Sequence, residues 1–260
     1  MTAHDADGRP DLGLAAAYLA TRTFPGRPLL CGVTGAHHYG FPSPDSDLDL
    51  KGIHLAPTAA LLGLDRPKET VDGIEIFRGV ECDLTSHEAG KALDLLVRGN
   101  GNLLERILSP FQVLETPELA ELQELARASV GRHFFGHYRG YLRGMRREHE
   151  REPKVKSMLY TLRVALTGVH LLRSGELEAD LGVNGPRYGM PEVAELIARK
   201  RAGDEKAPLP EAEDARFRAL WPRLEELLDE ARTSSPLPEK VPNRPALHDW
   251  LVRTRLAQLA

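Results

Sequence analysis

The chain has 260 residues, of which 42% are hydrophobic and 28% are charged, and its formal net charge is −4. These values are ordinary for a globular protein with one large or two modest domains, and no apolar run approaches the roughly 18 residues of a membrane span. The acidic, polar start, MTAHDADGRPDLG, is unlike a signal peptide, so we expect a cytoplasmic protein in which Cys31 and Cys82 are buried thiols.

The first third of the chain combines an amphipathic helical pattern with strand-like runs, one of them apolar and another alternating, which predicts mixed α and β structure. The expected elements are a short helix at 11–22, strands at 28–35, 47–57, 73–79 and 80–86, and a helix after the last strand. Ser86 is the expected N-cap of that helix, which should run to about Arg98, where the sequence GNGN ends it.

Helical periodicity is almost unbroken after residue 116. The expected helices lie near 117–130, 132–151, 154–174, 190–202, 211–232 and 244–259, and proline-rich segments separate the last of them. This change of character predicts an α+β fold in two domains. The first, at 1–116, contains β-strands and helices, and the second, at 117–260, is all-helical.

Three aspartates stand at alternate positions in the stretch GAHHYGFPSPDSDLDLKG. Side chains two residues apart on a strand point to the same side, so Asp47 and Asp49 should share a face while Leu48 and Leu50 turn into the core. Two carboxylates at that spacing can bracket a pair of divalent cations, which lie roughly 3.5 to 4 Å apart in phosphoryl-transfer sites. Asp45 fits turn chemistry beside a proline. From this stretch of sequence alone, a solvated turn before an exposed strand edge explains the aspartates equally well.

Two other motifs for cations or phosphates are each excluded by residues at two required positions. A calcium loop that begins at Asp45 needs Gly at its sixth position and Glu at its twelfth, where the chain has Leu50 and Ala56. A P-loop needs Lys and then Ser or Thr directly after Gly40, where the chain continues with Phe-Pro. The aspartates therefore belong to neither motif.

The same stretch resembles the signature of the DNA polymerase beta-like nucleotidyltransferase superfamily. That signature is a strand ending in Gly-Ser or Gly-Gly, a short gap, and then Asp, an apolar residue, and Asp or Glu. Here Gly35 and Ala36 take the first pair, ten residues intervene, and Asp47 and Asp49 complete the pattern. The resemblance implies a nucleotidyltransferase-type mixed sheet in the first domain.

The resemblance makes Thr34, Gly35, Ala36, His37 and His38 the candidate nucleotide-binding residues. Backbone N–H groups of this glycine-rich stretch would bind phosphate oxygens. The family serine, which contributes a hydroxyl beside the triphosphate, is replaced by Ala36. Thr34, His37 and His38 are the alternative hydrogen-bond donors.

The superfamily adds a third acid from a neighbouring strand, and the segment VECDLTS offers Glu81 and Asp83. We favour Asp83 because the sequence that follows it, DLTSHEAGKALDLLVRGNGNLLERIL, is similar to the corresponding segment of the RNA-repair-associated, RlaP-like nucleotidyltransferases. That subfamily also resembles this chain in an Asn-rich turn before an acidic helix, here Asn100, Asn102 and Glu105. Helix capping explains the asparagines equally well.

Positive charge is concentrated between Arg132 and Arg163, where nine Lys or Arg and three Glu give a net charge of +6 and leave −10 for the rest. On one helix, four arginines fall within about 60° of one another. This arginine stripe consists of Arg132, Arg139, Arg143 and Arg146. Contact with a polyanion and a solvated charged face are equally good explanations of it.

Glycines recur every four residues in the same segment, at Gly136, Gly140 and Gly144. Each costs roughly 1 kcal/mol of helix propensity relative to alanine. This cost predicts that a neighbouring element, most plainly a helix, packs close to the backbone.

The next expected helix carries Lys156, Tyr160 and Arg163 on one face. Members of the superfamily are similar in using basic residues of the helical part to hold the triphosphate. The resemblance therefore makes Lys156 and Arg163 candidate nucleotide-binding residues, and surface solubility explains them equally well.

Together the resemblances imply Mg²⁺-dependent transfer of a nucleotidyl group from an NTP to a hydroxyl, with release of pyrophosphate and with Mn²⁺ as an alternative ion. Asp47, Asp49 and Asp83 are the expected catalytic residues and ligands of two metal ions. The family and the arginine stripe favour RNA as the partner and an RNA end as the acceptor. Adenylylation of a protein or small molecule, and an NTP- or RNA-binding module without catalysis, are alternatives. The sequence indicates neither the transferred base nor the oligomeric state.

Overall fold

Two groups of residues pack into separate units in the computed structural model, which describes residues 3–5, 8–204, 208–241 and 243–259. The sheet unit consists of Met1–Gly35, Asp47–Ser129 and Val241–Ala260, and the helical unit consists of Ala36–Ser46 and Val130–Lys240. The chain leaves the sheet unit once for a short segment and once for the long helical stretch.

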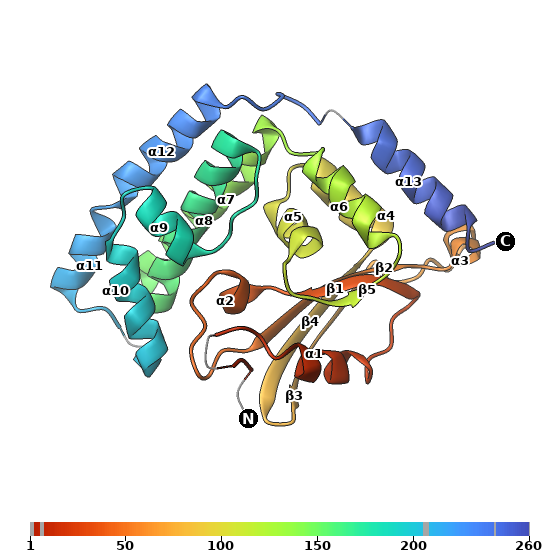
Figure 1. Ribbon diagram of the computed structural model, residues 1–260, viewed down its shortest axis with the longest axis horizontal. Helices are drawn as coiled ribbons and strands as arrows, with labels where there is room; N and C mark the ends of the chain where they lie inside the picture. Colours follow the sequence, from red (N-terminus) through yellow and green to blue (C-terminus); the bar gives the residue numbers. More distant parts are fainter. Residues whose placement is uncertain (1–2, 6–7, 205–207, 242, 260) are drawn as a thin grey trace. The chain divides into compact units, whose positions relative to one another are not determined.

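Five strands form one sheet in the order β3-β4-β2-β1-β5 (Figure 1). Their bounds are Arg27–Val33 for β1, Leu48–Leu55 for β2, Thr70–Phe77 for β3, Val80–Glu88 for β4 and Gln112–Glu115 for β5. β2 and β4 are parallel, and the other neighbouring strands are antiparallel. The predicted α+β class with a mixed sheet is confirmed, although β5 has no counterpart among the predicted strands.

Alternating burial along β2 and β4 builds the core of the sheet unit. Leu48 and Leu50 of β2 and Cys82 and Leu84 of β4 share one apolar cluster with α1, Leu12–Leu19. Burying a leucine side chain contributes about 1.5–3 kcal/mol, and a slip of one residue would turn the whole set to the other face. The polar side chains between these residues therefore point away from this core.

Cys31 and Cys82 are free and buried, as predicted. Burial raises the pKa of the Cys31 thiol to about 12 and that of the Cys82 thiol to about 11, because a thiolate is costly in apolar surroundings. Both side chains therefore act as small apolar groups of the core.

Among the residues that the structure describes, four helices from the first half of the chain and one from its last residues complete the sheet unit. They are α3 at Thr58–Leu62, α4 at Ala89–Val97, α5 at Gly101–Leu108, α6 at Leu119–Arg127 and α13 at Arg244–Leu256. On α5, the buried Arg106 donates a hydrogen bond to the Gly52 carbonyl of β2 at 2.8 Å. On α13, Arg255 donates to the Glu88 carboxylate at 2.9 and 3.0 Å, which attaches the last helix to the end of β4.

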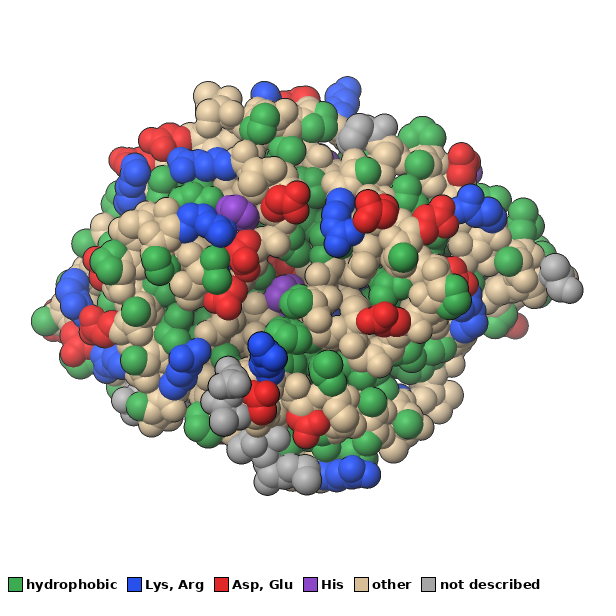
Figure 2. Space-filling view, viewed as in Figure 1, with side chains coloured by type: hydrophobic (Ala, Val, Ile, Leu, Met, Phe, Trp, Pro, Cys, Tyr) green, Lys and Arg blue, Asp and Glu red, His purple; other side chains and the backbone are tan. Residues whose placement is uncertain are grey.

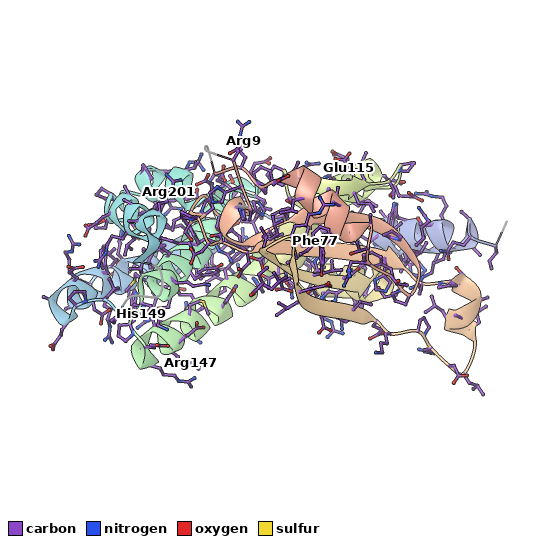
Figure 3. All side chains as sticks on the ribbon, turned by 90° about the horizontal axis from the view of Figure 1, so that it is seen from below. Arg9, Phe77, Glu115, Arg147, His149 and Arg201 are labelled. Atoms are coloured by element: carbon purple, nitrogen blue, oxygen red, sulfur yellow. The ribbon has the colours of Figure 1, made fainter. Side chains whose placement is uncertain are left out.

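The central helix of the helical unit is α8, Val155–Ser174, and most of its residues are buried. Its other elements are η1 at Arg132–Phe134, α7 at Phe135–Arg151, α9 at Leu181–Arg187, α10 at Glu192–Arg199, η2 at Lys200–Asp204, α11 at Glu211–Arg218 and α12 at Trp221–Ser234. His149, near the end of α7, is buried and hydrogen-bonded to Ser157 Oγ at 2.6 Å and to Asp214 Oδ1 at 2.7 Å (Figure 3). This contact joins α7, α8 and α11.

Within the part of the chain that the structure describes, no helix has the length and apolar character needed to cross a bilayer.

Two local predictions are wrong. Ser86 lies inside β4, where its hydroxyl is hydrogen-bonded to His54 Nδ1 at 2.9 Å, and Glu88 caps α4 by accepting from the Gly90 N–H at 2.6 Å. The single helix expected at 211–232 is two helices, because Pro222 lies in the first turn of α12 and cannot donate a hydrogen bond to a preceding turn. The helix α9 has no counterpart among the predicted helices, whereas α5 corresponds to the acidic helix expected after the Asn-rich turn.

The compact units divide the chain differently from the domain boundary expected near residue 116. Both α6 and α13 pack with the sheet, whereas the segment 36–46 packs with the helices. These units are groups of residues in contact and not contiguous segments, so the predicted domains, 1–116 and 117–260, stay a prediction.

We predict that His87 on β4 makes the sheet unit less stable in mild acid. Burial, together with nearby positive charge, lowers the pKa of His87 to about 4, from an ordinary value near 6.5. Between these two pH values the unfolded chain binds a proton that the folded chain does not, so stability should fall as the pH falls through this window.

Urea unfolding at pH 7 and at pH 5 should therefore show a smaller loss of stability for His87→Asn than for the wild type. Asparagine keeps a polar group near Thr70, whose hydroxyl lies 3.1 Å from His87 Nδ1. Equal losses in the two proteins would contradict the prediction.

Candidate active site

The parallel register of β2 and β4 places two of the predicted acids opposite each other, because Asp49 pairs with Asp83. Their side chains are 29% and 32% exposed, on the face away from the leucine core. Asp47 directly precedes β2, and its partial burial continues the alternation of that strand. The structure therefore brings Asp49 and Asp83 together at one end of the sheet.

Lys51 lies between these two acids, two residues after Asp49 on the same face of β2. Its Nζ atom is 2.8 Å from Asp83 Oδ2 and 3.7 Å from Asp49 Oδ1, and it also donates to Thr85 Oγ1 at 3.4 Å. Lys51 is not among the site residues expected from the sequence, although the same alternation that places Asp47 and Asp49 on one face continues to it. The two carboxylates thus already surround a cation.

The two candidates for the third acid occupy different positions along β4. Asp83 is opposite Asp49, whereas Glu81 precedes the residues that pair with β2, and it pairs with Ile76 of the edge strand β3. This register favours Asp83 as the partner of Asp49.

The backbone of Gly35 passes directly against the Asp49 carboxylate. Its φ angle is +64°, and a Cβ atom at this position would overlap Asp49 Oδ2. The preceding residue, Thr34, donates its backbone N–H to the Asp49 carbonyl at 2.8 Å. Only glycine satisfies both the left-handed conformation and this close approach.

The expected phosphate loop contains a short helix, α2, Gly35–His38. Ala36, His37 and His38 belong to the helical unit and are buried, as is Thr34 in the sheet unit. The histidine side chains are thus placed in packed surroundings and not on an open loop.

The two basic candidates on α8 differ in exposure. Lys156 is exposed, whereas Arg163 is 1% exposed and its guanidinium lies 3.7 Å from the centre of the Tyr39 ring. A second buried cation, Lys200, donates to Ser43 Oγ at 3.3 Å. Arg163 and Lys200 therefore hold the segment 36–46, and the sequence around Lys200, ARKRAG, gives no sign of this role.

Intramolecular partners occupy three of the four arginines of the stripe. Arg139 pairs with Asp229 and Arg146 with Glu225, both on α12, while Arg132 donates to the carbonyls of Ser235 and Leu237 at 2.6 and 2.9 Å. Arg143 is exposed. Figure 2 shows basic and acidic side chains intermixed over the face in view, and Arg147 points outward from α7 in Figure 3.

The glycines of α7 are not explained by close packing. A Cβ atom at Gly136, Gly140 or Gly144 would meet no atom within 4 Å. The expectation that a neighbouring element approaches this backbone is therefore wrong, and the structure gives no other reason for these glycines.

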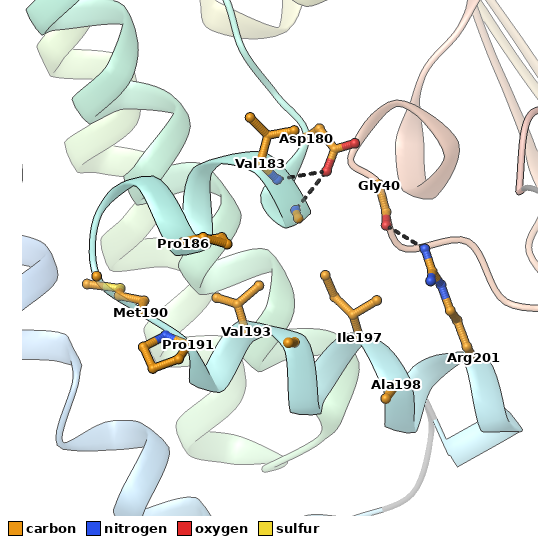
Figure 4. A pocket seen from close by; sticks show the side chains of 13 residues that line it. Gly40, Asp180, Val183, Pro186, Met190, Pro191, Val193, Ile197, Ala198 and Arg201 are labelled. Atoms are coloured by element: carbon orange, nitrogen blue, oxygen red, sulfur yellow. Dashed lines mark hydrogen bonds between the residues drawn. The ribbon is translucent and has the colours of Figure 1, made fainter.

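A pocket of about 940 Å³ lies beside Gly40 in the helical unit (Figure 4). Its lining is largely apolar and includes Val193 and Ile197 of α10, and Arg201 donates to the Gly40 carbonyl at 3.3 Å. Gly40 has a φ of +77°, and a Cβ atom there would overlap the Asp180 carboxylate. Contact with Asp180 is thus enough to require this glycine.

Within the described ranges, no three or more His, Cys, Asp and Glu side chains are grouped closely enough to hold a metal ion. Asp49 and Asp83 nevertheless supply the oxygen ligands that Mg²⁺ and Mn²⁺ prefer, on both sides of the Lys51 ammonium. The donor chemistry therefore fits a divalent cation.

Residues 21–253 match the model of a protein family described as RlaP, RNA repair pathway DNA polymerase beta family. The chain is also 27% identical to an uncharacterized protein of Methanocaldococcus jannaschii over 216 residues, which cover 81% of this chain and 86% of that protein. A crystal structure of a nucleotidyltransferase-like protein from Exiguobacterium sibiricum aligns with 85% of this chain and 72% of its own, at 13% identity. Its TM-score of 0.31 is too low to support a structural argument.

We predict that Gly35→Ala destabilises the protein. The left-handed conformation alone costs an alanine about 1–2 kcal/mol, and the overlap with Asp49 adds to this. Urea unfolding should show a lower midpoint than the wild type, and a midpoint equal to that of the wild type would contradict the packing of Gly35 against Asp49.

Gly140→Ala should have the opposite effect. Gly140 is exposed in the interior of α7 with open space around it, so alanine should stabilise the helix by up to about 1 kcal/mol. The same unfolding measurement provides the comparison, and a loss of stability would mean that some element does pack on this backbone.

Proposed function

Since the chain belongs to the RlaP family, described as the RNA repair pathway DNA polymerase beta family, we propose that it is a Mg²⁺-dependent nucleotidyltransferase that transfers an NMP from an NTP to a hydroxyl of an RNA end. The family is of the polymerase beta nucleotidyltransferase type, which supports a transferase. The dependence on a metal ion, the NTP substrate and the RNA acceptor are what we propose beyond the family type.

The observation that carries this proposal is the pairing of Asp49 with Asp83 around a cation. In the reaction, the acceptor hydroxyl oxygen forms a bond to the α-phosphorus of the NTP, and the bond from that phosphorus to the bridging oxygen breaks. Pyrophosphate leaves, and the hydroxyl proton passes to Asp83 or to water. Asp47, Asp49 and Asp83 would hold Mg²⁺ or Mn²⁺, which neutralises the negative charge that develops on the phosphate oxygens.

The nucleotide-binding part of the proposal rests on the backbone at the end of β1. Gly35 exposes its main chain next to Asp49, and the buried residues Thr34, Ala36, His37 and His38 shape the adjoining turn and helix. Because their side chains are packed, the backbone N–H groups are the better phosphate donors at this place.

Basic residues of α8 would complete the triphosphate site in different ways. Lys156 is exposed, which leaves its ammonium accessible to a phosphate. Arg163 is buried against Tyr39, so we propose that it acts by positioning the segment 36–46.

The acceptor is proposed from the family and from the basic residues of α7. Arg143 is exposed, and Arg132, Arg139 and Arg146 would contact RNA phosphates in exchange for their present partners. Adenylylation of a protein or a small molecule is the second candidate. Ala36, in place of the family serine, is the observation that favours a third, an NTP- or RNA-binding module without catalysis.

Incubation of the protein with Mg²⁺, α-labelled NTPs and total RNA, with and without a cell extract, separates the three candidates. Label in RNA supports the proposal, label in protein or in a small molecule supports the second candidate, and no label supports the third. Each of the four NTPs is tested separately because the sequence does not indicate the base.

We predict that the double substitution Asp47→Ala with Asp49→Ala abolishes labelling, and that Asp83→Asn lowers the initial rate by roughly 10²–10³, as is typical when a group that stabilises transition-state charge is removed. Glu81→Gln is the matched control, since Glu81 lies on the same strand outside the pairing with Asp49, and its rate should stay close to that of the wild type. Unchanged labelling by the double variant would show that the metal ligands are assigned wrongly.

A further inference from the structure

Lys51 makes a close set of polar contacts inside the proposed metal site. Its ammonium lies 2.8 Å from Asp83 Oδ2 and 3.7 Å from Asp49 Oδ1, with Thr85 Oγ1 at 3.4 Å and the Asp83 carbonyl at 3.5 Å. An ammonium has three N–H donors, and oxygens of three residues surround this one. Its position is therefore defined by the site and not by a single surface ion pair.

The place taken by the ammonium is the place that a shared metal ion would need. Mg²⁺ binds oxygen ligands at about 2.0–2.1 Å and requires near-octahedral geometry, so an ion held by both Asp49 and Asp83 would have to lie between their carboxylates. A divalent ion and an ammonium within about 4 Å of one another repel strongly. Both cannot occupy the gap between Asp49 and Asp83.

Lys51 is able to leave this place without unfolding the strand. Its side chain is 20% exposed, so the side chain is not enclosed in the core. The lysine stem is flexible and its head group is strongly hydrated, so the ammonium loses little when it moves into water. The backbone of β2, by contrast, is fixed by pairing on both sides.

We propose that the Lys51 ammonium is a resident cation that holds Asp49 and Asp83 together before metal binds, and that the divalent ion binds by displacing it. Lys51 is then a positioning residue that sets the metal concentration at which the site fills. This inference rests on the proposed function, because it takes the two acids as ligands of the metal ion.

Mn²⁺ titration in the absence of nucleotide tests this inference, with bound and free Mn²⁺ distinguished by electron paramagnetic resonance. Lys51→Met removes the competing charge and keeps a long side chain, so its Kd for Mn²⁺ should be about tenfold lower than that of the wild type, which corresponds to about 1.4 kcal/mol. Lys51→Arg keeps the charge and should not bind Mn²⁺ more tightly than the wild type.

Lys91→Met is the matched control. Lys91 is also in the sheet unit, but its ammonium donates to Thr70 Oγ1 at 2.6 Å, so the loss of its charge should leave the Kd unchanged. Thermal unfolding provides a second readout. Without metal, Lys51→Met should unfold at a lower temperature than the wild type because its carboxylates repel, and saturating Mn²⁺ should remove the difference.

Unchanged or weaker Mn²⁺ binding by Lys51→Met would overturn the inference and leave the proposed function standing. Equal tightening in Lys91→Met would overturn it as well, because the effect would then follow from net charge alone. If neither the wild type nor Lys51→Met bound Mn²⁺, both the inference and the metal-dependent function would be overturned.

Discussion

Parallel pairing of β2 with β4 is the constraint on which the candidate site depends. The chain reaches β4 from β2 through the edge strand β3, and the return places Asp49 and Asp83 side by side. Two carboxylates about 4 Å apart repel by about 1 kcal/mol in water and by about 4 kcal/mol at a protein surface. Burial of Leu48 and Leu50 on the opposite face offsets this cost, since each contributes about 1.5–3 kcal/mol. The core, together with the Lys51 ammonium between the carboxylates, thus keeps together two acids that would otherwise separate.

A second, independent contact orients Asp49 from the other side. The backbone of β1 continues into Thr34 and Gly35, where one N–H binds the Asp49 carbonyl and the next residue passes against its carboxylate. Asp49 is therefore held by pairing with β4 and by contact with the end of β1. Acids fixed by two rigid elements lose little freedom when they bind a cation, which is the condition for a preorganised site.

Period-two alternation groups Asp47 with Asp49 and Glu81 with Asp83, because the apolar positions between them have to be buried together, and the family resemblance favoured Asp83 over Glu81. The same rule extends to Lys51, but a lysine beside acids is ordinary in an exposed strand, and only the register of β2 with β4 shows that it reaches Asp83. Strand order and register come from contacts distant in the sequence, which local patterns do not encode. The misplaced cap at Ser86 has the same origin, since pairing with β2 extends β4 beyond the point at which local preference would end it.

Charge in the helical unit shows the limit of sequence patterns most clearly. The arginine stripe left two explanations open, and the structure adds a third, because Arg139 and Arg146 are paired with acids of α12. Partly exposed ion pairs of this kind contribute about 0–1 kcal/mol, so an RNA phosphate could replace Asp229 or Glu225 at small cost. Each exchange would gain less binding free energy than contact with an unpaired arginine, because the existing ion pair is lost. Binding of RNA by this face would therefore depend less steeply on salt than four unpaired arginines would imply.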